Sequence, residues 1–212
     1  MSDGRTTDHP QVKGSWKYGA GVLACLALAW FPFVRDTRVP LLGGVDLGFH
    51  ELGHMLTYWL PDTATAMMGS ITQVAVPLGL AAYFGLWRKE YLGAGLCLAW
   101  AGTSAHDVSI YIADAPYQAL ALIGGEHDWA FLLGGSLDSA AGIARTVNGA
   151  GMLMVVAGTA VCAAGPWLES RRQAAEPASA PAATAPSGGW AIGAVWEEDA
   201  SQADPTRTGG DG

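Results

Sequence analysis

Residues Leu41–Leu60 read LLGGVDLGFHELGHMLTYWL, an apolar stretch whose middle carries His50, Glu51 and His54. As a helix, these residues would be roughly 30 Å long at about 1.5 Å per residue, which matches the hydrocarbon core of a bilayer. The two histidines are four positions apart and therefore share one face of such a helix. The stretch predicts a membrane-spanning helix with paired imidazoles on one face and a carboxylate beside them.

The whole chain is apolar and poor in charge. Of its 212 residues, 50% are hydrophobic and 14% are charged, whereas soluble domains have about 25% charged residues. This composition predicts an all-α, polytopic membrane protein. The net charge of −8 argues against a nucleic-acid partner, which would need a basic face. The three cysteines stand in separate apolar runs, so they indicate neither a disulfide framework nor a Cys-x-x-Cys metal site.

Five apolar stretches are predicted to cross the membrane: residues 18–34, 41–60, 68–87, 91–113 and 147–168. Residues 114–146 are too polar to cross and are expected to form a loop or a partly re-entrant segment. The ends of the chain, residues 1–17 and 169–212, are expected to be disordered tails because their composition cannot bury a core. A single membrane domain over residues 18–168 lies between them.

The residues His50, Glu51 and His54 form a His-Glu-x-x-His motif, the pattern of zinc hydrolases. Two neutral imidazoles one helical turn apart can bind Zn²⁺ together with a third protein ligand, and a neighbouring glutamate can act as general base. Together, Glu51 and Asp46 would cost about 5–7 kcal/mol if unpaired in a bilayer, so this face should line a protein cavity that holds a cation. The structural alternative is a pair of histidines that only hydrogen-bond to neighbouring helices.

The third zinc ligand must come from another part of the chain. Asp107 is the leading candidate because it lies deep in the fourth apolar stretch, where an unpaired carboxylate would be costly. Asp46 precedes His50 by one turn and could instead orient an imidazole. The remaining candidates for a ligand or for an orienting partner are His127, Asp128 and Asp138.

Gln73 and Pro77 in the third stretch are a candidate substrate-handling element. A proline frees backbone carbonyl groups in a helix, and a glutamine near them could hydrogen-bond to an extended peptide. The alternative is an ordinary kink beside a satisfied polar residue.

HELGH at residues 50–54, the Gly69-Ser70-x-x-Gln73 entry to the next stretch and the Asp107-bearing stretch after it resemble the site-2 protease-like intramembrane zinc metalloproteases. The resemblance covers roughly residues 41–115. The segments DVSIYIADA and GGEHDW, at residues 107–115 and 124–129, are similar to an uncharacterised bacterial branch of that family. The family's usual Leu-Asp-Gly motif is absent, and Leu137-Asp138-Ser139 only approximates it.

The resemblance implies a three-helix catalytic core with zinc held by His50, His54 and an aspartate, and with Glu51 as general base. It implies a zinc metalloendopeptidase of the bacterial cytoplasmic membrane that cleaves membrane proteins or peptides in or near the lipid bilayer. The alternative function is a non-proteolytic zinc-binding membrane protein, either a scaffold or a transporter component. The first and last apolar stretches carry almost no polar residues, which disfavours a transport path.

Overall fold

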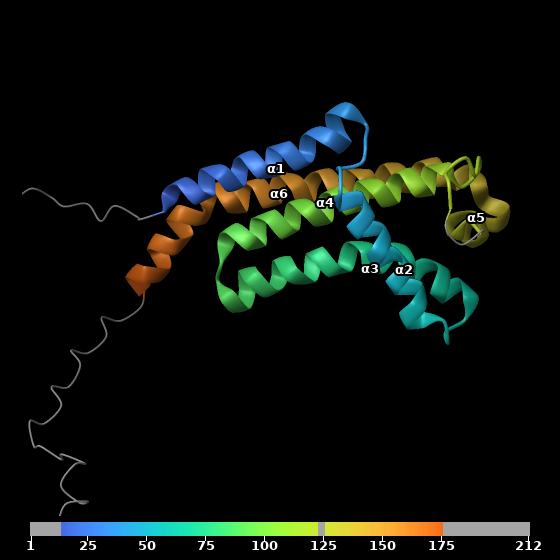
Figure 1. The fold of residues 1–212 in the computed structure, drawn as a ribbon, viewed down its shortest axis with the longest axis horizontal. Helices are drawn as coiled ribbons and strands as arrows, with labels where there is room; N and C mark the ends of the chain where they lie inside the picture. Colours follow the sequence, from blue (N-terminus) through green and yellow to red (C-terminus); the bar gives the residue numbers. More distant parts are fainter. Residues whose placement is uncertain (1–13, 123–125, 176–212) are drawn as a thin grey trace, which may run out of the picture. The chain divides into compact units, whose positions relative to one another are not determined.

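The computed structural model describes residues 14–122 and 126–175, and every regular element within these ranges is helical. The predicted all-α fold is therefore confirmed for the described residues. In chain order the elements are α1 (Ser15–Arg35), α2 (Leu42–Thr57), α3 (Asp62–Ala82), the π-helix η1 (Tyr83–Arg88), α4 (Tyr91–Asp114), α5 (Asp128–Leu133), the 3₁₀-helix η2 (Gly134–Ser139) and α6 (Ala140–Ala175) (Figure 1).

Three helical segments are long and apolar enough to cross a membrane: Ser15–Arg35, Asp62–Arg88 and Asp128–Ala175. In their apolar windows only 22%, 28% and 22% of the residues are buried within the protein, so most of these surfaces need an apolar environment outside the chain. Length and composition thus support three of the five expected crossings. Helix α2 has 16 residues, or about 24 Å, and α4 is long enough but polar in its second half.

The tails expected at residues 1–17 and 169–212 fall mostly outside the described residues. Where the structure describes them, the chain is helical, because α1 begins at Ser15 and α6 continues to Ala175. These two helix ends are joined by Lys17 Nζ, which lies 3.2 Å from Glu169 Oε1, and by a hydrogen bond that the Tyr18 hydroxyl donates to Glu169.

Residues 114–146, expected to be a loop or re-entrant segment, are partly helical in the structure. They include α5, η2 and the first turns of α6, which begins at Ala140. The polar residues Arg145 and Thr146 do not interrupt helix α6, and both are exposed on its surface. The first two residues of the segment GGEHDW, at positions 124–125, lie outside the described residues.

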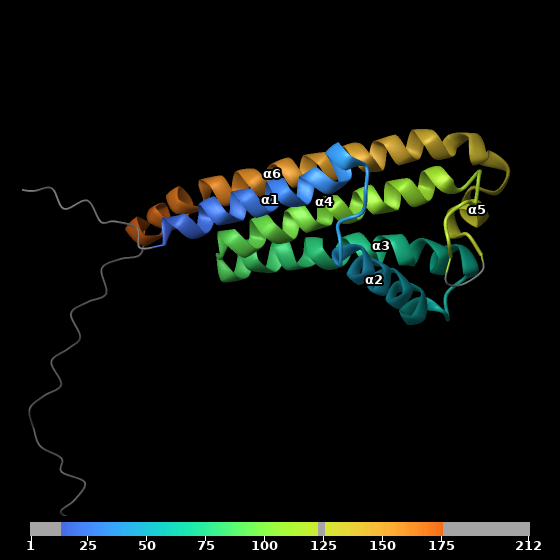
Figure 2. The same ribbon diagram turned by 45° about the horizontal axis from the view of Figure 1, so that its top comes forward.

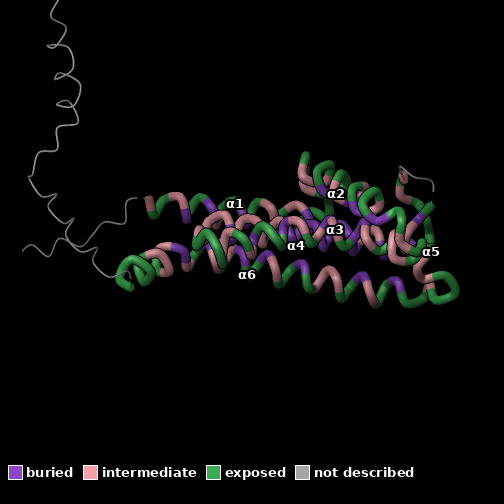
Figure 3. The backbone as a smooth tube through the Cα atoms, turned by 90° about the horizontal axis from the view of Figure 1, so that it is seen from below, coloured by how far each residue is buried: buried purple, intermediate pink, exposed green. Residues whose placement is uncertain are grey.

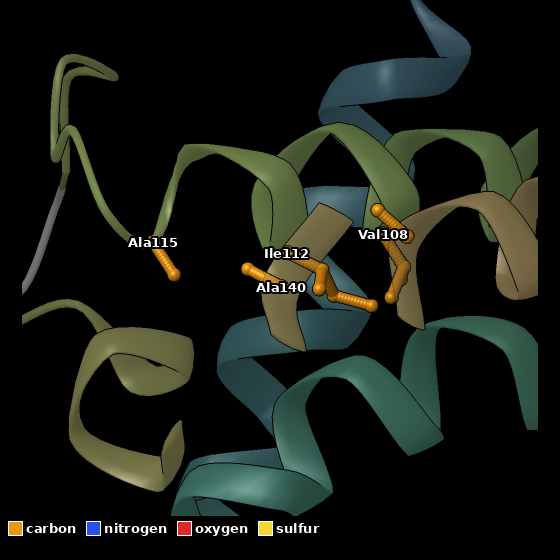
Figure 4. Packing of buried hydrophobic residues seen from close by; sticks show 5 residues of the cluster. Val108, Ile112, Ala115 and Ala140 are labelled. Carbon is orange, nitrogen blue, oxygen red and sulfur yellow. The ribbon is translucent and has the colours of Figure 1, made fainter. Parts of the chain in front are cut away.

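Helix α4 is the most buried element, with every residue from 101 to 109 buried (Figure 3). It packs against α6 through small residues: a β-carbon on Gly102 would lie 2.5 Å from the carbonyl oxygen of Gly151, and one on Gly158 would lie 2.5 Å from that of Gly95. Such close backbone contact is typical of helix packing in membranes. An apolar cluster of α4 and α6 residues, including Val108, Ile112 and Ala140, continues this contact towards α5 (Figure 4).

Helix α2 crosses α3 obliquely near the end of the helices where α5 lies (Figures 1 and 2). The two helices approach closely at Gly53, where a β-carbon would overlap the carbonyl group of Met68. Pro61 precedes α3 and supplies a backbone conformation suited to a helix start, and Asp62 in the first turn favours the positive end of the helix dipole. The motif-bearing face of α2 is consequently held against α3, with α4 and α5 beside it.

Candidate metal centre

His50 and His54 lie on the same face of α2, as their spacing predicts, with ring centroids 4.8 Å apart. The face is turned inward, and His50 is only 6% exposed. Gly53 on the same helix allows α2 to approach α3 closely enough for both imidazoles to contact it. The helix therefore presents two ring nitrogens to the interior rather than to its surroundings.

The hydrogen bonds of the two rings set their tautomers. His54 Nδ1 is 2.9 Å from the carbonyl oxygen of Thr65, which can only accept, so Nδ1 carries the proton. His50 Nδ1 lies 3.3 Å from Gln73 Oε1 and donates to it in the same way. Each neutral imidazole then has its lone pair on Nε2, which is the form that binds a metal.

Asp128 brings a carboxylate to these two nitrogens. Its Oδ2 atom lies 3.0 Å from His50 Nε2 and 3.2 Å from His54 Nε2. Tyr111 fixes this carboxylate, because its hydroxyl donates to Asp128 Oδ2 at 3.3 Å and accepts from the Asp128 backbone N–H at 3.1 Å. His127 caps α5 by accepting the N–H of Ala130 at 3.2 Å, so Asp128 is held in the first turn of a capped helix.

His50, His54 and Asp128 thus form a group that can hold a metal ion, with one donor atom from each within 4.8 Å of the others. In a tetrahedral zinc site with ligand distances of about 2.0–2.2 Å, neighbouring donor atoms are about 3.3–3.6 Å apart. The two nitrogen–oxygen separations differ from that by only a few tenths of an ångström. Without a proton or a cation between them, lone pairs of two nitrogens and one oxygen would face one another.

Gly69 of α3 faces the same point. A β-carbon there would lie 2.5 Å from His54 Nε2 and 2.6 Å from His50 Nε2. The missing side chain leaves the two donor nitrogens accessible, and this space together with the donor set fits a metal ion. In the sequence, Gly69 was noted only as part of a motif that resembles a protease family. The structure shows why a glycine is needed there, because any side chain would collide with the two imidazoles.

Glu51 lines a cavity of about 480 Å³ into which the three donor residues also open. It follows His50 directly and is half-buried. A carboxylate at this position in the cavity can accept a proton from a water molecule near the three donors. Asp107 and Gln73 belong to the same cavity wall.

The structure places the other candidate ligands differently. Asp107 is buried and lines the cavity, but it is not part of the group formed by the two histidines and Asp128. Asp46, expected as a possible partner of an imidazole, accepts hydrogen bonds at 2.8 Å from Trp100 Nε1 and Ser104 Oγ instead. Asp138 is exposed on η2.

The remaining candidates have structural partners. The ring of His127 stacks on that of Tyr111 at 4.2 Å, and its Nε2 lies 3.4 Å from Asp114 Oδ2. Gln73, expected to handle substrate, is buried and contacts His50 as described above.

Thr65 and Tyr111 were not expected in the site. Tyr111 follows Asp107 by one helical turn and so shares its face of α4, which is a signal that the sequence contains. Thr65 contributes a backbone oxygen, for which a sequence carries no signal.

The chain matches no protein-family model, no curated protein and no solved structure.

Proposed function

We propose that this protein is a membrane-embedded zinc metallopeptidase that hydrolyses peptide bonds in or near the bilayer. The observation that carries the proposal is the convergence of His50 Nε2, His54 Nε2 and Asp128 Oδ2 beside Glu51 in one cavity. Two imidazole nitrogens and one carboxylate oxygen are one of the donor sets of catalytic zinc sites, which keep a fourth position open. Asp128 takes the role of third ligand in this proposal.

The residues of the chain then have distinct tasks. Bound zinc would supply Lewis-acid polarisation of the scissile carbonyl group and of water. Glu51 takes a proton from the attacking water and delivers it to the nitrogen of the leaving amine. Gln73 and the Thr65 carbonyl keep the imidazoles in the binding tautomer, and Tyr111 holds Asp128 in place.

The membrane setting is supported by the apolar and largely unburied surfaces of α1, of α3 with η1, and of the segment from α5 to α6. We propose that α2 and the polar half of α4 complete the membrane domain from within, so that the chain has five membrane segments. Because the carbonyls of a helical substrate are engaged in its own hydrogen bonds, the substrate must be extended in the cavity before it can be cleaved. The resemblance to bacterial intramembrane proteases favours the cytoplasmic membrane as the location.

Zinc content and peptide hydrolysis test the proposal. The purified chain should contain about one zinc per molecule by elemental analysis and should cleave a quenched fluorescent peptide in detergent micelles. His54→Ala should lose both, while His106→Gln, which changes a buried histidine outside the donor group, should retain the metal. Metal retained in His54→Ala would contradict the site.

Glu51→Gln separates a peptidase from a zinc-binding scaffold or transporter component. The substitution keeps the size of the side chain but removes the general base, so zinc should stay and hydrolysis should fall by at least about 100-fold. Unchanged hydrolysis would remove Glu51 from this role. A wild-type chain that binds zinc without cleaving any peptide in a diverse library would favour the non-proteolytic alternative.

A further inference from the structure

Asp107 is a buried carboxylate without a hydrogen-bond partner among the described residues. It is 7% exposed and lines the same cavity as the metal centre. Asp46 provides the contrast, because it is 2% exposed yet accepts hydrogen bonds from both Trp100 and Ser104. A carboxylate in a membrane protein is costly unless it is paired, so Asp107 is suited to a cationic partner that enters the cavity.

The charges around Asp107 compensate its carboxylate only in part. Arg38, Asp46 and His106 are the titratable groups that act on its carboxylate. Arg38 is exposed and interacts with both Asp46 and Asp107, so a single positive charge is shared between two carboxylates. The cavity as a whole is acidic: Arg38 is the only lysine or arginine among its described lining residues, which include the five carboxylates of Glu51, Asp62, Asp107, Glu126 and Asp128.

The rise of helix α2 gives an approximate distance from Asp107 to His50, the nearer of the two histidines in the sequence. A β-carbon on Gly43 would lie 3.7 Å from Asp107 Oδ2. Gly43 precedes His50 by two helical turns, which corresponds to about 10 Å along α2. An extended peptide covers that distance with about three residues.

We propose that Asp107 binds an ammonium group of the substrate, about three residues from the bond that is cleaved. This inference rests on the proposed peptidase function and names the chemical class of its substrate: an extended peptide with a free amino terminus or a lysine side chain at that distance. The ammonium group pairs with the buried carboxylate, and the peptide between them occupies the cavity.

Hydroxamate peptides, which bind zinc through the hydroxamate group, test this inference by calorimetry on the zinc-loaded full chain in detergent. The probes are tri-alanine hydroxamate with a free amino terminus, its N-acetylated form, and acetyl-Lys-Ala-Ala hydroxamate. At least one ammonium-bearing probe should bind about tenfold more tightly than the neutral acetylated one. The stronger of the two identifies the source of the ammonium group.

Asp107→Asn should abolish this preference while leaving zinc content and the Kd of the neutral probe unchanged. Asp138→Asn is the matched control, because it makes the same substitution at an exposed carboxylate, and it should keep the preference. Equal binding of charged and neutral probes by the wild type, or a preference that survives Asp107→Asn, would overturn the role of Asp107. If none of the three probes binds to the zinc-loaded wild type, the zinc site fails and this inference fails with it.

Discussion

The Cα atom of Gly69 faces the imidazole of His54 so closely that a β-carbon on residue 69 would lie 2.5 Å from His54 Nε2. A separation of that size lies inside van der Waals contact, so any side chain at position 69 would have to displace the ring. Because residue 69 is a glycine, α3 can pack closely against α2 while the Nε2 atom of His54 stays accessible.

Gly69→Ala should lower zinc affinity by at least about tenfold, because the added methyl group competes for the space in front of both donor nitrogens. Competition with a fluorescent zinc chelator measures the change. Gly79→Ala on the same helix is the matched control, since a β-carbon there has no neighbour within 4 Å. Equal affinities of the two variants would show that the space beside Gly69 is not needed for the metal.

Asp128→Asn should weaken zinc binding far more than Asp107→Asn. Of these two carboxylates, only that of Asp128 has an oxygen within reach of both Nε2 atoms, and an amide oxygen is a poorer zinc ligand than a carboxylate. Zinc titration of both variants under identical conditions provides the comparison. The reverse order would return the role of third ligand to Asp107.

Gln73→Leu should reduce zinc affinity by about 10–100-fold, because His50 loses the acceptor that holds its Nδ1 proton. Helical content by circular dichroism should not change, since the leucine side chain is similar in size. Gln73→Glu is the informative companion, as it retains an acceptor for the Nδ1 proton and should keep more of the affinity. Indistinguishable affinities of Leu and Glu variants would exclude this orienting role.

Gly102→Ala should destabilise the bundle by about 1–3 kcal/mol, since the new methyl group would meet the carbonyl oxygen of Gly151 at 2.5 Å. Unfolding in mixed detergent micelles measures the effect. Gly149→Ala on α6 is the control, because a β-carbon there meets nothing within 4 Å. If both variants unfold alike, α4 and α6 are not in close backbone contact.

The sequence alone predicts the helical fold and the shared face of His50 and His54, since both depend on local periodicity. It also identifies Asp107 as a carboxylate that needs a partner, because the cost of burial depends only on residue type and depth. It cannot rank Asp107 against Asp128 as the metal ligand. That choice depends on where the short helix α5 packs, and α5 is held by a hydrogen bond of 3.0 Å from Trp129 Nε1 to Ser70 Oγ on α3.

The roles of Asp46 and Gln73 show the same limit. Their polar character within apolar stretches predicts that they have partners, but the partners come from other helices. Asp46 contacts Trp100 and Ser104 of α4, and Gln73 contacts His50 of α2. Asp46 was thus expected to contact an imidazole but contacts α4 instead. Gln73 was expected to contact a substrate, but in the structure it contacts the imidazole of His50.

The wide sequence separation of the donor atoms sets an order of events during biosynthesis. Asp128 follows His50 by 78 residues, which a ribosome adds in roughly 4–16 s at about 5–20 residues per second. Throughout that interval the nascent chain contains the two histidines and Glu51 but lacks the carboxylate that completes the group. Under the proposed function, a growing chain therefore has no complete metal site while it passes through the insertion machinery, and it gains one only after α5 has been synthesised and has docked.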